Sequence, residues 1–307
     1  MSKQQVSFFW FRRDLRLEDN VGLFHALKSK YTVIPLFIFD DAILDSLPYN
    51  DPRVGFIYEN LSKINTQLLK IESALLVKKG KTLAVWELLL TEFDIKEVFF
   101  NKDYEPYAIK RDSAICELLE TNNAIPFSFK EQVIFEEITK ADGLPYTVYT
   151  PFKNKWLEKY KSMAPVLEYD ATDVFSNFHK CDFVFPSLEQ IGFEKSPIKV
   201  KPHNLKFIAN YQDIRDFPAL DQTSYLSPHL RFGTVSIRKL VNWAFHKNDV
   251  FLSELIWREF FMQILFSFPK VVTQNFKTAY DGIKWRNNEA DFQRWCSGTT
   301  GYPMVDA

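Results

Sequence analysis

Short apolar runs alternate with longer helical stretches through the first 129 residues, and this alternation constrains the fold more than any other feature. Extended segments are predicted at 6–11, 32–39, 74–78, 97–100 and 125–129, and helices at 19–28, 53–70, 82–93 and 107–119. Continuous apolar strands separated by helices are typical of a parallel sheet with helices on both faces. The sequence therefore predicts an α/β fold with a doubly wound parallel sheet, in which ligands bind at the carboxyl ends of strands.

The pattern changes in the second half of the chain, where strands are no longer predicted. A helix follows Pro151, and four prolines then interrupt the stretch 162–204, which we expect to cross the surface of the first domain. Helices are predicted at 207–216, 227–245, 252–268 and 288–295. We therefore expect an α/β domain over 1–135, an inter-domain connection over 136–205 and an all-helical domain over 206–307.

Composition excludes several classes of protein. With 46% hydrophobic and 16% aromatic residues, the 307-residue chain can bury the cores of two domains. The three cysteines lie far apart and form no paired motif, so neither a disulfide framework nor a metal site is predicted. No export signal or membrane span is expected, which predicts a soluble cytoplasmic protein. Because the net charge is -1, a nucleic-acid-binding surface would need its positive charge concentrated in one local patch.

The predicted helix 252–268 contains no glycine or proline before Pro269 and carries apolar residues on all sides, so we expect it to be buried. Glu254 and Arg258 are four residues apart and could neutralise each other as an internal ion pair. Trp257 lies on the same face, which suits stacking on a flat ring at a cavity wall. Spacing alone leaves both interpretations open, a structural ion pair and a binding site.

Two polar stretches are further candidates. Thr223, Ser224 and Ser227 precede or begin the helix at Pro228, a pattern typical of a capped turn or of an anion site. The loop 101–105 follows a predicted strand and is either an ordinary polar loop or a ligand contact. The first domain has no glycine-rich dinucleotide or triphosphate motif.

Five stretches together resemble one known family, and they occur in the same order as in that family. They are F-F-W-F-R-R-D-L-R-L-E-D-N at 8–20, N-K-D-Y-E-P-Y at 101–107, T-S-Y-L-S-P-H-L-R-F-G at 223–233, E-L-I-W-R-E-F at 254–260, and W-C-S-G-T-T-G-Y-P-M-V-D-A at 295–307. The chain resembles the DNA photolyase and cryptochrome family over nearly its whole length. The resemblance implies an α/β antenna-binding domain followed by a helical FAD-binding domain. It also implies that the charged cluster at 12–16 holds the two domains together.

The resemblance also implies roles for individual residues. Glu254 and Trp257 match residues that meet a flipped pyrimidine dimer, Arg215 matches a contact to a DNA phosphate, and Trp285 matches the outer member of an electron-carrying tryptophan chain. Glu105 matches a residue that holds a folate antenna in some members. Phe251 replaces a tryptophan that lies near the flavin in some members, and Arg258 matches a contact to phosphate or ribose. The full set of residues that match FAD contacts is Tyr211, Thr223, Ser224, Tyr225, Leu226, Ser227, Phe251 and Arg258.

The implied activity is light-driven splitting of cyclobutane pyrimidine dimers in UV-damaged DNA by a monomeric flavoprotein, a deoxyribodipyrimidine photo-lyase. FAD is the expected cofactor, with a folate or deazaflavin as second chromophore, and no metal is expected. The alternatives are a cryptochrome-type blue-light sensor, a (6-4) photolyase, and a non-enzymatic nucleotide-binding module. A helix start at Pro303 so close to Ala307 suggests a C-terminally truncated chain whose helical domain is incomplete. We therefore expect this chain to bind flavin weakly or not at all, and it could be inactive in this form.

Overall fold

A computed structural model describes residues 3–306 of the chain. Met1, Ser2 and Ala307 lie outside the described residues, so the helix predicted to start at Pro303 is described only to Asp306. The described chain divides after Ser267 into two compact units, and each is treated by itself. The sheet and most of the helices fall in the first unit. The three-region division of the chain therefore stays a prediction.

The sheet of the first unit is parallel and five-stranded, with the order β3-β2-β1-β4-β5. The chain moves outward from β1 to β3 and then returns to place β4 on the other side of β1, so the strand order reverses between β1 and β4. This confirms the predicted doubly wound sheet. The strands are β1 (Gln5–Phe11), β2 (Thr32–Asp40), β3 (Leu76–Gly80), β4 (Asp94–Asn101) and β5 (Ile125–Phe129).

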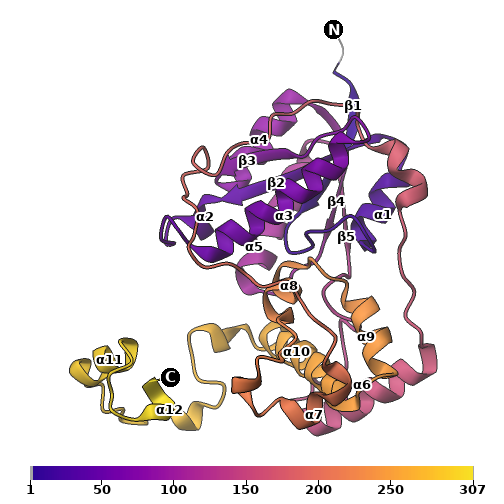
Figure 1. Cartoon of the computed structure of the whole chain (residues 1–307). Coiled ribbons are helices and arrows are strands. Elements are labelled where there is room, and N and C mark those ends of the chain that lie inside the picture. The colour runs from indigo at the N-terminus through magenta and orange to yellow at the C-terminus, as the bar shows by residue number, and fades with distance from the viewer. Residues whose placement is uncertain (1–2, 307) are drawn as a thin grey trace. The chain divides into compact units, whose positions relative to one another are not determined.

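Helices cover both faces of this sheet (Figure 1). Phe9 and Phe11 of β1 face a core built with α1 (Val21–Leu27) and α3 (Pro52–Leu69). Phe8 and Trp10 face the opposite core, built with α4 (Thr82–Glu92) and α5 (Pro106–Thr121). Successive side chains of a strand point to opposite faces, which is why continuous aromatic residues suit this buried strand. The short helix α2 (Asp41–Leu44) was not predicted.

The predicted connection is more than a surface crossing. It contains α6 (Tyr149–Met163), and the stretch expected to cross the surface, 162–204, begins at the end of this helix and contains the 3-10 helix η1 (Thr172–Asn177). Phe178 is buried and pairs with Val33 at the start of β2, where the amide of His179 donates to the carbonyl of Val33 at 2.8 Å. Ile191 and Phe193 are also buried in the core on the α1 side of the sheet. The apolar side chains of Phe178, Ile191 and Phe193 thus form part of that core.

The helical part of the first unit is more broken than the sequence predicted. The expected helix 227–245 is two helices, because Gly233 turns the chain with a φ of 64° and Ser236 then caps a new helix. The expected helix 207–216 is a 3-10 turn followed by a single α-helical turn. The elements are η2 (Ile208–Asn210), α7 (Tyr211–Ile214), η3 (Pro218–Leu220), α8 (Leu226–Phe232), α9 (Ile237–Phe245) and α10 (Asp249–Ser267).

The second unit is small and contains only short helices. They are η4 (Pro269–Val272), η5 (Thr278–Tyr280), α11 (Glu289–Cys296) and α12 (Pro303–Asp306). The carboxylate of Asp306 accepts hydrogen bonds from the amides of Thr300 and Gly301, each at 2.8 Å, which holds this last turn against the preceding loop. Across residues 3–306, the chain forms no helix with the length and apolar character needed to span a membrane.

Candidate functional site

The loop after β1 joins the sheet to α8. The amide of Leu15 donates to the carbonyl of Phe232 at 3.0 Å, and the Arg13 guanidinium donates to the carbonyl of Arg231 at 3.1 Å. The guanidinium of Arg16 reaches the carbonyl of Gly233 at 2.8 Å. These contacts confirm that the charged cluster after the first strand connects the α/β part to the helical part.

A buried ion network strengthens this junction. Arg238 of α9 lies 3.0 Å from the carboxylate of Asp19 and 3.0 Å from that of Glu131, and all three side chains are almost fully buried. Glu131 also pairs with Arg16. The charges alternate in sign, so each buried carboxylate faces a guanidinium that offsets its cost of desolvation. The network fixes α9 against the start of α1 and the segment after β5.

A second buried carboxylate, Glu259, anchors α10. It accepts hydrogen bonds from the amides of Ile134 and Phe135 at 2.6 and 3.0 Å and from the indole of Trp156 at 2.8 Å. Burial raises the pKa of Glu259 to about 7, although these donors and the charge of Arg258 oppose the rise. Glu259 therefore ties α10 to α6 and to the segment that follows β5.

Arg258 is turned inward as well. Its guanidinium donates to the carbonyls of Gln132 at 2.7 Å and Leu230 at 3.4 Å, and burial lowers its pKa to about 10. Of the two interpretations that the spacing left open, the Glu254–Arg258 ion pair is wrong, because Arg258 lies against main-chain carbonyls and the buried acid next to it is Glu259. On a helical wheel Glu259 falls between Leu255 and Ile256, at the centre of the buried face. This position could have identified Glu259 as the buried acid from the sequence, but the prediction considered only the spacing of Glu254 and Arg258.

Glu254 instead meets a residue of another helix. Its carboxylate accepts a hydrogen bond from Arg215, just beyond α7, at 2.6 Å, and both side chains are about one-third exposed. The Arg215 guanidinium also lies 5.3 Å from the centre of the Tyr211 ring. Tyr211 packs edge-on against Phe251 with the ring centres 5.3 Å apart. Helices α7 and α10 thus bring four of the predicted site residues together.

Trp257 lies one turn further along α10, on the same side as Glu254. Tyr149, at the start of α6, stacks on its indole with ring centres 3.5 Å apart and planes inclined by 8°. Phe261, the next aromatic residue on this side, is 60% exposed. The prediction that α10 is buried on every side is therefore wrong. One face of the helix enters the core, and the face that carries Glu254, Trp257 and Phe261 is partly open.

The hydroxyl-rich segment 223–227, which leads into the first turn of α8, is anchored at its centre and open at its ends. The Leu226 side chain is buried in the core that α6, α9 and α10 share, and the Ser224 carbonyl accepts the amide of Asn204 at 2.8 Å. Tyr225 has a φ of 52°, which turns the chain into α8. Thr223 and Ser227 are exposed, and among residues 3–306 their hydroxyls have no hydrogen-bond partner.

Glu105 and Trp285 lie apart from this cluster. Glu105 pairs with Arg13 at 2.9 Å and with Arg231 of α8. Burial raises its pKa, but the Arg231 hydrogen bond and the Arg13 charge outweigh burial and lower it below the ordinary value. Glu105 is thus part of the junction between sheet and α8. Trp285 belongs to the second unit, so its relation to Glu254 and Trp257 stays a prediction.

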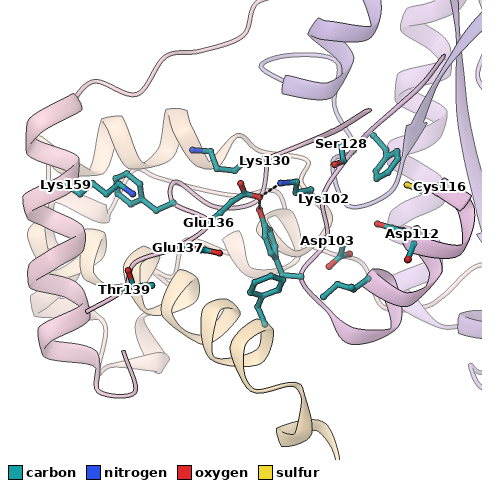
Figure 2. Close-up of a pocket in the computed structure, with 16 residues that line it drawn as sticks. Lys102, Asp103, Asp112, Cys116, Ser128, Lys130, Glu136, Glu137, Thr139 and Lys159 are labelled. Carbon is teal, nitrogen blue, oxygen red and sulfur yellow. Dashed lines mark hydrogen bonds and ion pairs between the residues drawn. The ribbon is translucent and has the colours of Figure 1, made fainter. Parts of the chain in front are cut away.

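A cavity of about 790 Å³ lies next to the loop that precedes Glu105 (Figure 2). Lys102 and Tyr104 line it, and both hydrogen-bond to the carboxylate of Glu136, at 2.9 and 3.2 Å. Phe266 near the end of α10 closes another side. Burial, and then the charge of Glu136, raise the pKa of Tyr104 above its usual range.

Among residues 3–306, no group of three or more metal-ligating side chains occurs.

Comparison with known proteins identifies two matching family models. The model described as DNA photolyase matches residues 7–173, and the model described as FAD binding domain of DNA photolyase matches residues 251–307. The deoxyribodipyrimidine photo-lyase of Halobacterium salinarum is 32% identical, with 98% of this chain and 70% of that protein aligned. The deoxyribodipyrimidine photo-lyase of a Synechococcus strain is 30% identical, with 97% of this chain and 68% of that protein aligned.

Solved structures agree with these matches. A bacterial class III photolyase from Agrobacterium tumefaciens superposes with a TM-score of 0.82 at 27% identity, and the alignment covers 100% of this chain and 68% of the Agrobacterium chain. An archaeal photolyase from Sulfolobus tokodaii, whose crystal structure holds two FAD molecules, has a TM-score of 0.75 at 30% identity, with 99% of this chain and 69% of its own covered. Sequence models, curated relatives and fold all agree, and the chain belongs to the DNA photolyase family.

Proposed function

We propose that this protein repairs UV-damaged DNA in a light-dependent reaction that splits cyclobutane pyrimidine dimers, with FAD as its cofactor. The relatives described above are deoxyribodipyrimidine photo-lyases. The observation that carries the proposal is the partly open face of α10, where an acid and an indole lie one turn apart beside an arginine of the neighbouring helix. An acid can hydrogen-bond to the base edge of a flipped dimer, and an indole can stack on one of its bases.

The residues that lead into the first turn of α8 fit a dinucleotide cofactor. The Thr223 and Ser227 hydroxyls are exposed and have no partner among residues 3–306, so they are free to donate to phosphate oxygens. Tyr211 and Phe251 offer aromatic surface at the core that also holds Leu226. When bound, a reduced flavin supplies the light-excited electron that opens the cyclobutane ring. The remaining predicted contacts, Ser224, Tyr225 and Leu226, shape the turn on which these hydroxyls lie.

Arg258 fits a cofactor contact less well than the sequence suggested. Two of its nitrogens already donate to carbonyls, and the residue is only partly exposed. Within the proposal, Arg258 acts mainly by holding α8 against α10. Its contact to phosphate or ribose stays a prediction.

The lesion would be held by three side chains. Glu254 accepts a hydrogen bond from a base edge, Trp257 stacks on a pyrimidine, and Arg215 contacts a backbone phosphate. Extruding a damaged pair costs a few kcal/mol, and one aromatic stack returns roughly 1–3 kcal/mol per base. In the free protein Arg215 already neutralises Glu254, so DNA that draws Arg215 to a phosphate frees the carboxylate for the base.

Two further roles belong to the same proposal. Trp285 would pass electrons towards the flavin, and a folate or deazaflavin would serve as second chromophore near the loop of Glu105. The cavity beside Lys102 and Tyr104 supports the second role, because the same loop lines it. The Glu105 carboxylate itself is engaged by two arginines.

The test is a repair assay with the 307-residue protein, excess FAD, a reductant and an oligonucleotide that carries one thymine dimer. We expect blue light to restore the undamaged oligonucleotide, as followed by chromatography. Trp257→Ala should weaken binding of the dimer oligonucleotide by roughly 5- to 150-fold, the equivalent of one lost base stack. Glu254→Gln should slow repair with little change in the free energy of unfolding, because exposed ion pairs contribute only about 0–1 kcal/mol.

Trp243→Ala on α9 and Glu158→Gln on α6 are matched controls, since both side chains lie outside the proposed lesion site. FAD binding is measured separately by fluorescence quenching, which also tests the expectation of weak flavin binding. Repair of (6-4) lesions alone would favour that alternative. Flavin photochemistry without repair of either lesion would favour a light sensor, and binding of another nucleotide without binding of flavin or DNA would favour a nucleotide-binding module.

A further inference from the structure

Tyr149 forms the closest aromatic contact of the open α10 face. Its ring lies parallel to the Trp257 indole, with centres 3.5 Å apart and planes inclined by 8°. Phe260 packs edge-on against the same indole at 5.6 Å and 76°, and edge-on against Tyr149 at 5.8 Å and 70°. One face of the indole is therefore covered by Tyr149, and the buried Phe260 supports both rings from the core side.

The hydroxyl of Tyr149 fixes the position of its ring. It lies 2.8 Å from the carbonyl and 2.6 Å from the hydroxyl of Ser253, which precedes Trp257 by one turn of α10. Lys153 of α6 reaches the same Ser253 hydroxyl at 3.2 Å. The tyrosine is thus held at both ends, by a ring stack and by hydrogen bonds to the helix that carries the indole.

The Trp257 indole can stack on a base only if its plane is held at a defined angle. Trp257 is only half-buried, and its side chain has no hydrogen bond to the residues that the structure describes, so packing alone sets its plane. Among the aromatic rings that contact this indole, Tyr149 is the one that comes from outside α10. Within α10, Phe261 also lies nearly parallel to the indole, with ring centres 5.3 Å apart and planes inclined by 21°. These two rings leave a base only the remaining surface of the indole to contact, which restricts how a lesion enters.

We propose that Tyr149 is a positioning residue that sets the plane of the Trp257 indole and so determines how well the site distinguishes a pyrimidine dimer from undamaged DNA. This inference rests on the proposed function. Stacked aromatic pairs contribute beyond their buried area, and the orientation of the indole decides whether a flat base can overlap it. Undamaged DNA is bound through its phosphates and does not require this orientation.

The test uses fluorescence anisotropy in the dark to measure affinity for a dimer oligonucleotide and for the undamaged oligonucleotide of the same sequence. In Tyr149→Leu we expect the ratio of the two affinities to fall by roughly twofold to tenfold, the range of one aromatic pair. Tyr149→Phe keeps the stack and should retain most of the ratio. Affinity for undamaged DNA should stay within about twofold in both variants, because phosphate contacts are unchanged.

Tyr160→Leu is the matched control. Tyr160 lies on the same helix, stacks on Trp156 with ring centres 5.0 Å apart and an 11° inclination, and donates to Asn242 at 2.7 Å. It is more deeply buried than Tyr149, so its loss should lower the urea midpoint at least as much. The ratio of affinities should nevertheless stay at the wild-type value. This separates positioning of the indole from general loss of stability.

Three outcomes are distinguishable. A ratio that falls in Tyr149→Leu but not in Tyr160→Leu supports the inference. An unchanged ratio in Tyr149→Leu, or an equal fall in Tyr160→Leu, overturns it and leaves the proposed function standing. Wild-type protein that binds both oligonucleotides equally contradicts the proposed lesion recognition itself.

Discussion

Glu254 and Glu259 lie on the same helix but differ in their access to solvent. Glu254 shares a partly exposed ion pair, whereas the carboxylate of Glu259 is buried and accepts three hydrogen bonds. A buried acceptor of this kind holds helices in place, because removing it leaves donors without partners. The acid that fixes α10 is therefore distinct from the acid proposed to contact DNA.

Glu259→Gln should lower the free energy of unfolding by about 1–3 kcal/mol, the cost of leaving at least one buried N–H donor unsatisfied. An amide presents only one acceptor oxygen where the carboxylate uses both. Urea unfolding followed by tryptophan fluorescence measures the change. Glu158→Gln on the exposed side of α6 serves as control and should change the free energy of unfolding by no more than about 1 kcal/mol. Equal urea midpoints for Glu259→Gln and wild type would contradict this assignment.

The raised pKa of Glu259 also predicts a dependence of stability on pH. Burial raises the pKa from 4.5 to about 7 in the folded state, so the folded protein holds a proton that the unfolded chain has released between these values. The contribution of this group to stability is greatest below pH 4.5 and is lost as the pH rises through about 7. The stability difference between wild type and Glu259→Gln should therefore fall from pH 5 to pH 8. A constant difference would mean that Glu259 is ionised throughout this range.

At the scale of elements, the turn between α8 and α9 is the most tightly constrained connection of the helical part. Gly233 has a φ of 64°, and a Cβ atom at this position would lie 2.2 Å from the carbonyl oxygen of Arg13 and 2.6 Å from the Cα of Asp14. Both contacts are with backbone, which cannot move aside as a side chain can. The loop after β1 therefore approaches α8 this closely only because residue 233 has no side chain.

Gly233→Ala should lower the free energy of unfolding by more than about 1 kcal/mol, since both the left-handed backbone and the backbone contact oppose a side chain. Gly55→Ala is the matched control. Gly55 lies inside α3 with open space around its Cα, so alanine there should raise stability by about 0.5–1 kcal/mol. Thermal and urea unfolding of the two variants should shift in opposite directions. A neutral Gly233→Ala would show that the loop after β1 relaxes freely.

At the scale of the whole molecule, the first unit depends on charges that bridge its two parts. Arg238 lies between Asp19 before α1 and Glu131 after β5, and its side chain is 4% exposed. These three residues come from regions more than 100 positions apart in the sequence. The network thus couples the sheet to the helices that carry the proposed site.

Arg238→Met should destabilise the protein by about 3–5 kcal/mol, because two buried carboxylates lose a shared partner. The neighbouring Lys239→Met removes only partly exposed pairs with Glu18 and Glu168 and should cost about 0–1 kcal/mol. Urea unfolding at constant pH compares the two variants. If both changes cost the same, the buried network contributes nothing beyond an exposed pair.

Local periodicity was sufficient to predict the architecture of the first domain. All five strands and the longer helices between them were predicted within a few residues, because alternating and helical patterns depend on neighbouring residues alone, and only the short helix α2 was missed. The same periodicity placed Glu254 and Trp257 on one face of α10. The broken helices around Gly233 were missed, since a glycine in a helical pattern does not show by itself that another backbone lies against it.

The sequence by itself thus determined the α/β sheet, the position of α10 and the residue types along its open face. Only the tertiary structure decided their partners: Arg215 for Glu254, Tyr149 for Trp257, and the amides of Ile134 and Phe135 for Glu259. Spacing along a helix predicts neighbours within that helix, such as the Glu254–Arg258 pair that does not form. Partners between elements are set by how helices pack, and packing joins residues whose separation in the sequence carries no information about their distance in space.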